Sequence, residues 1–203
     1  MLGPKEGSRK TEYKVLSTIF KGRNFYARCS DKKKMIESIV FNSGNLIRDL
    51  EKYQPDSRNK NVCVYVLLND GDLNSIEIVK KAQQENKKLR HIRYVSPRFI
   101  KHCLDSKIFI SNPQKESLIH LLPFNCKVPI MHAEKVKIFV KFANLGVQDT
   151  YEKCCSILGF LMVEEKAEAN VLIVEKSLIP KFAESLKNSA QIIVKDSFVL
   201  ECI

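Results

Sequence analysis

The sequence VSPRFIKHCL at residues 95–104 recurs 99 residues later as VKDSFVLECI at residues 194–203. In both copies a phenylalanine precedes a cysteine by four residues, so the two side chains share one face of a helix. A period near 100 residues is too long for a solenoid unit, but it is the size of a small domain. We therefore predict two tandem copies of one fold, with Phe99 and Phe198 buried at equivalent positions.

The bulk composition is that of an ordinary globular protein. The 203 residues are 44% hydrophobic and 28% charged, which is sufficient for one medium core or two small ones. No apolar run approaches the length of a membrane span, and the first residues lack the apolar core of a signal peptide. We expect an intracellular protein. The net charge of +11 is compatible with nucleic acid, acidic protein tails or phosphorylated peptides, and does not choose between them.

Cysteine and histidine spacing gives no sign of a metal site or a disulfide framework. Cysteine occurs seven times, an odd number, with no CxxC pair and no histidine at metal-ligand spacing. We interpret the cysteines as small, buried hydrophobic residues of a protein in a reducing compartment. We expect no cofactor and no metal. The histidines stand apart, at positions His91, His102, His120 and His132, and are interpreted as structural or exposed.

The first half alternates strands and helices. Strands are predicted at 25–30, 45–50, 62–68 and 90–95, with a polar loop at 51–61. Almost every residue of 62–68 is apolar, which is typical of a strand covered on both faces of a parallel sheet. A helix begins at 31–34 and ends at Ser43-Gly44. A second, capped by Asn74 or Ser75, extends to about Lys88.

The second half repeats this order after a connector at 111–135 that contains three prolines. Strands are predicted at 136–142, 161–164, 170–174 and 191–194, and helices at 149–158 and 180–187. The fold class is therefore α/β, with two domains that each contain a four-stranded parallel sheet flanked by helices. We assign 1–12 to a linker, 13–122 to the first repeat, 123–133 to an inter-repeat linker and 134–203 to a second repeat with a truncated last helix.

Short motifs in this frame are similar to those of a known family. They are Phe20-Lys21-Gly22-Arg23-Asn24-Phe25 before the first strand, Ser43-Gly44 and Leu158-Gly159 after the first helices, and the aromatic-x-x-x-Cys of the repeated helices. The chain resembles a tandem pair of BRCT domains, the modules of DNA-damage-response scaffolds. The family usually has tryptophan where Phe99 and Phe198 stand, so this chain, which contains no tryptophan, is a divergent member.

The resemblance implies a phosphoserine pocket in the first repeat, formed by Ser30, the backbone N–H of Asp31, and Lys80. A hydroxyl, an amide N–H and an ammonium are the donors that phosphate oxygens need. Lys81 is the alternative if the helix register shifts by one residue. The family commonly has glycine where Asp31 stands, and an acidic side chain is unfavourable beside a phosphate. As the structural alternative, Ser30 bonds only its own backbone.

The second repeat lacks these donors. Its first strand aligns Ala143 with Ser30, and its second helix has Pro180-Lys181, so only the first repeat is expected to bind phosphate. The resemblance implies that the second repeat helps to bind a residue a few positions after the phosphoserine. For that specificity pocket we propose Ala82, Asn144 and Leu145.

The functional hypothesis is a nuclear scaffold module that binds a phosphoserine-containing protein, such as a phosphorylated histone tail or a checkpoint protein. An enzyme is not expected, because the sequence has no phosphate-binding glycine loop, no Walker lysine, no paired metal-binding acids and no nucleophile elbow. Two alternatives stay open. One is weak direct contact with DNA through residues 32–34, 87–88 and Arg90. The other is a structural or dimerisation module with an inactive phosphate pocket.

Overall fold

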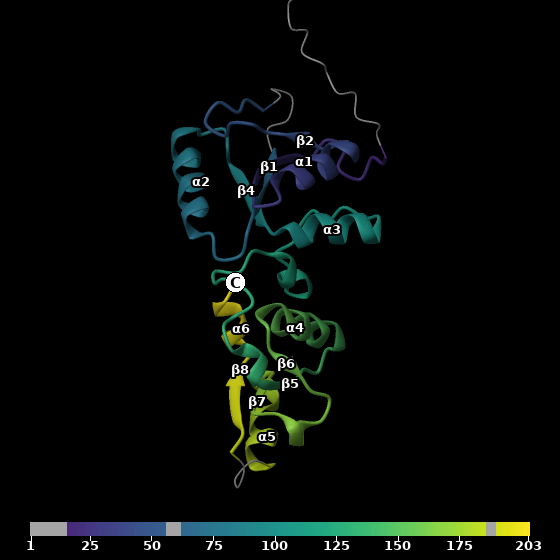
Figure 1. Cartoon of the computed structure of the whole chain (residues 1–203), viewed down its shortest axis with the longest axis vertical. Coiled ribbons are helices and arrows are strands. Elements are labelled where there is room, and N and C mark those ends of the chain that lie inside the picture. Colours follow the sequence, from purple (N-terminus) through teal and green to yellow (C-terminus); the bar gives the residue numbers. More distant parts are fainter. Residues whose placement is uncertain (1–15, 56–61, 186–189) are drawn as a thin grey trace, which may run out of the picture.

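The computed structural model describes residues 16–55, 62–185 and 190–203. Two lobes, one from each repeat, lie end to end along the long axis of the molecule, with the connector between them (Figure 1). The predicted leading linker, the end of the loop at 51–61 and the end of the helix at 180–187 lie outside the described residues.

The first repeat is built on a parallel sheet of four strands in the order β2-β1-β3-β4. Its elements in chain order are β1 (Asn24–Arg28), α1 (Lys32–Phe41), β2 (Asn45–Leu46), β3 (Cys63–Leu68), α2 (Leu73–Glu85), β4 (His91–Val95) and α3 (Pro97–Ser106). Strand β3 lies between β1 and β4, which explains its almost unbroken apolar sequence.

Two apolar layers cover the two faces of this sheet. On one face, residues of α1 and α3 pack with Phe25 and Tyr65, and Phe99 is fully buried and stacked on the Tyr65 ring at 5.7 Å. On the other face, Val79 and Ala82 of α2 pack on β3. Helix α2 therefore lies across the sheet from α1 and α3, as Figure 1 shows.

The second repeat has the same topology, with strand order β6-β5-β7-β8 and all neighbours parallel. Its elements are β5 (Lys137–Lys141), α4 (Leu145–Leu158), β6 (Leu161–Met162), β7 (Val171–Val174), α5 (Ile179–Ser185), β8 (Ile192–Lys195) and α6 (Ser197–Glu201). Short 3₁₀ helices are η1 (Glu116–Leu121), η2 (Ala133–Lys135), η3 (Lys166–Glu168) and η4 (Lys176–Leu178). The predicted fold class is confirmed.

Strand register confirms the sequence alignment of the repeats. Phe25 pairs with Leu46 and Tyr65, and Ile138 pairs with Met162 and Val171, so Phe25 and Ile138 are equivalent. With this offset of 113 residues, Ala143 of the second repeat is equivalent to Ser30 of the first, as the sequence predicted. In the fourth strands, Arg93 pairs with Tyr65 and Ile192 with Val171, which reproduces the offset of 99 residues.

Several local predictions need correction. The second strands of the two repeats have only two residues each and are shorter than predicted. The cap of α2 is Asp72, whose carboxylate accepts the Ser75 N–H at 3.0 Å, rather than Asn74 or Ser75. Helix α4 begins at Leu145, four residues before the predicted start, because Asn144 caps it.

The predicted full burial of Phe198 is wrong. Phe198 is only partly buried and lies beside Phe160, whereas its neighbour Val199 is fully buried in the second core. With the offset of 99 residues, α6 begins at the equivalent of Arg98, one residue later than α3, whose first residue is Pro97. The two repeated helices therefore align in sequence, but α3 buries Phe99 fully whereas α6 does not bury the equivalent Phe198 fully.

The connector packs on both lobes. Leu121 belongs to the first core, whereas Ile119 and Phe124 belong to the second. The Thr150 hydroxyl of α4 donates to the Ser117 carbonyl at 3.0 Å. Packing on both cores fixes the connector against the two lobes at once.

Candidate functional site

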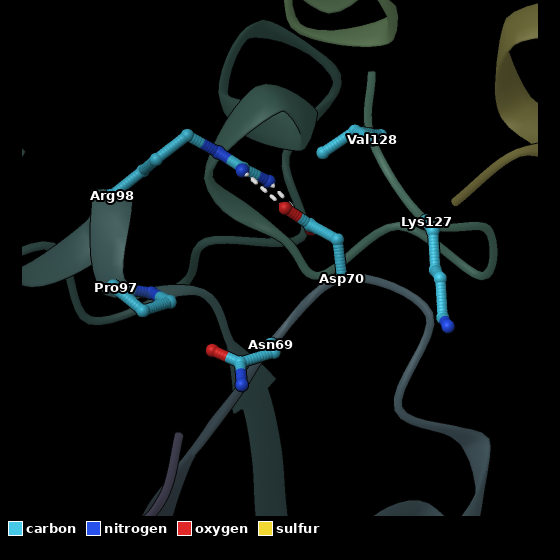
Figure 2. Close-up of a pocket in the computed structure, with 6 residues that line it drawn as sticks. All are labelled: Asn69, Asp70, Pro97, Arg98, Lys127 and Val128. Carbon is cyan, nitrogen blue, oxygen red and sulfur yellow. Dashed lines mark hydrogen bonds and ion pairs between the residues drawn. The ribbon is translucent and has the colours of Figure 1, made fainter. Parts of the chain in front are cut away.

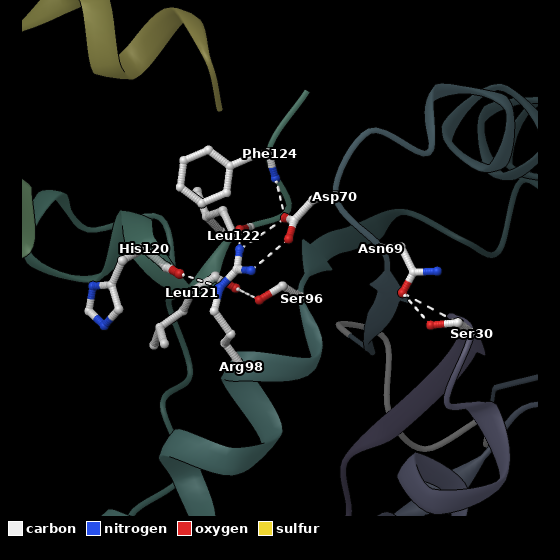
Figure 3. A network of polar contacts seen from close by, with 9 residues as sticks. All are labelled: Ser30, Asn69, Asp70, Ser96, Arg98, His120, Leu121, Leu122 and Phe124. Atoms are coloured by element: carbon white, nitrogen blue, oxygen red, sulfur yellow. Dashed lines mark hydrogen bonds and ion pairs between the residues drawn. The ribbon is translucent and has the colours of Figure 1, made fainter. Parts of the chain in front are cut away.

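The candidate site lies at the carboxyl edge of the first sheet, where β1 and β3 end. In a parallel sheet the carboxyl ends of all strands meet at one edge, and loops there commonly bind ligands. Ser30 follows β1 and Asn69 follows β3 directly. The Ser30 N–H and hydroxyl both donate to Asn69 Oδ1, each at 3.3 Å (Figure 3). We call this pair the first corner.

The second repeat has an equivalent pair, which we call the second corner. The offset between β3 and β7 is 106 residues, so Glu175 stands where Asn69 stands in the first repeat. Its Oε2 accepts the Ala143 N–H at 2.9 Å, and its Oε1 accepts the Ser177 hydroxyl at 2.6 Å. These hydrogen bonds, with Ser177 the larger cause, lower the pKa of Glu175 below its ordinary value. The second corner therefore contains a carboxylate that is ionised at neutral pH.

A pocket of about 400 Å³ adjoins the first corner. Its lining residues are Asn69, Asp70, Pro97, Arg98, Lys127 and Val128 (Figure 2). Lys127 is exposed, and its backbone lies on Gly71, where an added Cβ would stand 2.8 Å from the Lys127 nitrogen. Gly71 also has a φ of 72°, a value that favours glycine. This glycine therefore lets the connector pass directly over the loop after β3.

The ion pair of Asp70 and Arg98 fixes the wall of this pocket. The guanidinium donates to both carboxylate oxygens, at 2.6 and 2.9 Å, a bidentate geometry that restricts both side chains. Arg98 also donates to the carbonyls of His120 and Leu122, both at 2.9 Å. Asp70 accepts the Phe124 N–H at 2.7 Å (Figure 3). Asp70 thus neutralises Arg98, and Lys127 is the unneutralised cation among the six lining residues.

The connector makes further bonds around this pair. The Gly71 N–H donates to the Phe124 carbonyl at 2.7 Å, and Ser96 donates twice to the Leu121 carbonyl, each at 3.0 Å. The Arg98 guanidinium lies 5.1 Å from the centroid of the Phe124 ring. These bonds join loops that are 25 or more residues apart. They keep the pocket in a defined shape beside the first corner.

Comparison with solved structures identifies the architecture. A scan against protein-family models and a search of curated proteins each find no match. Yeast Rtt107 aligns over 91% of this chain and 42% of its own, at 17% identity and a TM-score of 0.50. Rtt107 solved with Slx4 aligns over 92% and 40%, at 16% identity and a TM-score of 0.50. The S. pombe Rad4 structure named BRCT3,4 aligns over 89% of each chain, at 14% identity and a TM-score of 0.44.

The fold is that of a tandem BRCT pair. This confirms the resemblance on which the site assignment depends. The chain spans about two fifths of the Rtt107 chains that it matches. At these identities the match establishes the fold of the BRCT repeats and leaves their ligands to be argued from the site itself.

The predicted phosphate residues of the first BRCT repeat are all exposed, but they lie at different distances from the carboxyl edge of the sheet. Ser30 and Asp31 are exposed neighbours at the start of α1, and Asp31 caps that helix through its backbone. Lys80 and Lys81 are exposed on α2, the eighth and ninth of its thirteen residues. At 1.5 Å per residue, Lys80 lies about 10 Å along α2 from its start at the carboxyl edge. The role of Lys80 stays a prediction.

The predicted specificity pocket is not assembled from its three residues. Ala82 is 4% exposed, because it faces the core beneath α2, and that assignment is wrong. Asn144 uses its side-chain oxygen to cap α4, accepting the Gly146 and Val147 N–H groups at 2.8 and 3.2 Å. Leu145 is 73% exposed. Asn144 and Leu145 follow Ala143, beside the second corner.

Sequence reasoning missed the residues that line the pocket. In the sequence prediction, Asn69 and Asp70 have no functional role, and Lys127 is placed only in the proline-containing connector. One available signal was position, because a polar residue directly after a buried strand of a parallel sheet lies at the carboxyl edge. The partners of Arg98 had no such signal, since they lie 22 to 28 residues away in the chain.

The basic residues of the alternative DNA-contact hypothesis separate into two groups. Residues 32–34 begin α1 at the carboxyl edge of the sheet, whereas residues 87–90 precede β4 at the amino edge. The structure therefore does not bring them into one surface. Within the described residues, no group of three or more His, Cys, Asp or Glu side chains is arranged to bind a metal, and no helix is long and apolar enough to cross a membrane. All seven cysteines are free thiols.

Proposed function

We propose that this tandem BRCT pair is a phosphoserine-binding protein-interaction module of a DNA-damage-response or genome-maintenance scaffold. In this proposal Ser30, the Asp31 N–H and Lys80 bind the phosphate in the first repeat. The observation that carries the proposal is the contrast between the two corners. The first has a hydroxyl and a neutral amide, whereas the second has a methyl group and a carboxylate.

The two side chains of the first corner, Ser30 and Asn69, offer hydrogen-bond donors. Neither carries a negative charge that would repel a phosphate. The Ser30 hydroxyl can rotate from Asn69 Oδ1 toward a phosphate oxygen, since a hydroxyl carries one donor and two acceptor lone pairs. With Oδ1 facing Ser30, the Asn69 amide nitrogen points elsewhere and stays a donor (Figure 3). The N-terminus of α1 follows directly, and its unpaired N–H groups favour an anion.

The second corner is occupied by its own anion. The Glu175 carboxylate already accepts the Ala143 N–H that a phosphate would use. Its negative charge would repel a phosphate placed within hydrogen-bond distance of the same N–H. Ala143 has no hydroxyl to replace the lost bond. Phosphate binding is therefore expected in the first BRCT repeat alone, which agrees with the sequence prediction.

The pocket beside Asn69 supplies a place for peptide residues next to the phosphoserine. Its free cation is Lys127, and its wall is the neutralised pair of Asp70 and Arg98. We expect this pocket to favour an acidic or small polar residue. Lys127 takes the specificity role that the sequence prediction gave to Ala82.

The fold indicates the class of partner, which is another protein, and not its identity. Rtt107, one of the proteins that this chain is similar to, has been solved with Slx4 and with Mms22. A nuclear phosphoprotein, such as a histone tail or a checkpoint protein, is what the family resemblance implies for this chain. We expect no chemical reaction at the site.

The test is a titration with matched phosphorylated and unphosphorylated serine peptides, followed by fluorescence anisotropy at two salt concentrations. Charge-assisted hydrogen bonds contribute about 1.5 to 3 kcal/mol each, so Ser30→Ala or Lys80→Ala should weaken the phosphopeptide roughly tenfold or more. Lys81→Ala is the register control, and Ala143→Ser in the second repeat should change the affinity little. Each variant's melting temperature verifies the fold.

Two outcomes would contradict the proposal. If the folded Ser30→Ala/Lys80→Ala double variant keeps its phosphopeptide affinity, the phosphate binds elsewhere. If the wild-type chain does not prefer the phosphorylated form across a panel of peptides, the module is a scaffold with an inactive pocket.

A further inference from the structure

The first sheet has a second concave surface, at the opposite edge from the candidate phosphate site. It is a groove of about 670 Å³ along β4, which is the outer strand of the sheet. Its lining residues are Cys63, Gln83, Arg90, His91, Ile92, Arg93, Tyr94 and Gln114. We call it the edge groove. In the described part of the chain, β4 pairs only with β3, so its outer side is open to a ligand.

The charges in the edge groove are all of one sign. Its charged side chains are those of Arg90 and Arg93, and none of its eight lining residues is acidic. Across residues 16–55, 62–185 and 190–203, neither arginine makes a side-chain hydrogen bond or ion pair. Two guanidinium groups therefore face this groove with all their donors available.

Arg93 belongs to the outer strand that lines the groove. It pairs with Tyr65 in the strand register, and Cys63 pairs with the neighbouring His91. Burial raises the pKa of the Cys63 thiol, and the Arg93 charge is the largest effect that opposes this rise. The guanidinium thus stands close to Cys63. Arg90 is exposed at the rim, three residues earlier.

The sequence around β4 extends this positive field. Residues 86–93 include four Lys or Arg residues and no acidic one. Lys88 donates to Gln54, but Lys87 is exposed and forms no ion pair within the described residues. The amide of Gln114 adds a neutral donor to the groove wall, whereas the Gln83 amide nitrogen already donates to the Leu89 carbonyl at 2.9 Å. The surface is therefore rich in donors that match phosphate oxygens.

We propose that the edge groove binds the phosphodiester backbone of a nucleic-acid strand. Arginine guanidinium groups bind phosphates in a fork geometry, and a groove with cations and no acid follows a phosphate backbone without reading its sequence. A peptide that adds a strand to β4 would take its specificity from pockets for alternate side chains. The edge groove is lined mainly by charged and amide groups, which favours the phosphate backbone.

This site is separate from the proposed phosphoserine site. Strands β1 and β4 are parallel and have five residues each. The amino and carboxyl edges of the sheet therefore lie about 16 Å apart, at roughly 3.3 Å per residue. Ser30 follows the carboxyl end of β1, whereas Arg90 precedes the amino end of β4. One chain can therefore bind a phosphoprotein and a nucleic-acid strand together.

The test is fluorescence anisotropy of the full chain with a fluorescein-labelled single-stranded DNA of about 20 nucleotides. The Arg90→Gln/Arg93→Gln variant should bind at least tenfold more weakly at 50 mM salt. Its log–log salt dependence should be shallower by about 1.4, since each lost phosphate contact on single strands removes about 0.7 from the slope. Phosphopeptide affinity should stay unchanged. The exposed Arg90→Gln alone should give a smaller loss without affecting the fold.

The matched control is Lys32→Gln/Lys33→Gln, which removes the same charge at the other edge and should weaken DNA binding less than threefold. Equal losses in both double variants would show that net charge alone attracts DNA, and would overturn the proposal. Absence of wild-type binding at 50 mM salt would overturn it as well. So would groove-dependent binding of a polyglutamate peptide in preference to DNA, which would identify an acidic peptide as the occupant.

Discussion

The first and second corners differ at two positions on otherwise matching frames. Both repeats have the same strand order, the same parallel register and a bond from the residue after the first strand to the residue after the third strand. In the first repeat that bond joins Ser30 to a neutral amide, and in the second it joins Ala143 to a carboxylate. The comparison teaches that the frame positions a backbone N–H in both repeats, while two side chains decide whether an anion can use it.

The first corner also adjoins a pocket whose lining includes the free cation Lys127. A pocket of about 450 Å³ in the second repeat, lined in part by Glu152 and Glu164, includes neither Ala143 nor Glu175. A phosphate at the first corner would therefore have a positive charge close by.

The repeats also differ in how they contact the connector. The residues equivalent to Asp70 and Arg98 are Lys176 and Ser197, given the offsets of 106 and 99 residues. Lysine and serine cannot form the bidentate ion pair. Only the first repeat therefore has this means of fixing the connector beside its carboxyl edge.

The largest expected effect concerns the two cores. Phe99→Ala should lower the free energy of unfolding by about 3 to 5 kcal/mol, since the ring is fully buried and stacked on Tyr65. Phe198→Ala should cost roughly half as much, because that ring is only partly buried. Urea unfolding followed by circular dichroism measures both. Equal losses in the two variants would contradict the difference in burial.

His120 gives a pH-dependent measure of the contact between the repeats. Burial, and then the charge of Lys153 in the second repeat, lower its pKa from 6.5 to about 4. The unfolded chain therefore binds a proton between these values that the folded chain does not. Stability should be complete above pH 6.5 and fall by about 2 to 3 kcal/mol as the pH approaches 4.

The measurement is a series of urea-unfolding curves between pH 7 and pH 4. His120→Gln should flatten the curve, because the amide has no proton to gain. His132→Gln is the matched control, since it makes the same substitution at a histidine that is 65% exposed. A wild-type slope that persists in the His120 variant would assign the effect to other groups.

The Asp70 and Arg98 pair predicts a moderate loss of stability that is specific to the first repeat. Asp70→Asn leaves a partly buried guanidinium without its charge partner and should cost about 2 kcal/mol. Lys176→Asn, at the equivalent exposed position, should change stability by less than about 0.5 kcal/mol. Thermal and urea unfolding check both variants. A loss in the second variant as large as in the first would remove this distinction between the repeats.

The smallest expected change gives the sharpest test of the corners. Asn69→Asp keeps the shape and the acceptor for Ser30, but it gives the first corner the negative charge that Glu175 gives the second. It should weaken a phosphoserine peptide about tenfold, or 1.4 kcal/mol, with little change in melting temperature. Peptide titration at low salt measures the loss.

Glu175→Gln is the control for that variant, since it removes a charge from the corner where Ala143, which has no hydroxyl, replaces Ser30. It should leave phosphopeptide affinity unchanged. If Asn69→Asp also leaves the affinity unchanged, the phosphate does not approach the first corner, and the contrast between the repeats has another role.

The sequence by itself determined the frame of this protein. The apolar run at 62–68, the repeated helix and the order of elements were sufficient to predict two parallel four-stranded domains, because these signals depend on local periodicity. The alignment of Ser30 with Ala143 was also a sequence result, and strand register confirmed it. Each of these depends on residues close together in the chain or on simple repetition.

Only the tertiary structure decided which side chains meet. Asn69 bonds Ser30 across 39 residues, and Asp70 bonds Arg98 across 28. The burial of Ala82 and the partial exposure of Phe198 likewise depend on the exact rotation of α2 and α6 on their sheets. A shift of one residue turns a helical side chain by about 100°, so local pattern alone does not fix these contacts. The packing of distant segments decides them.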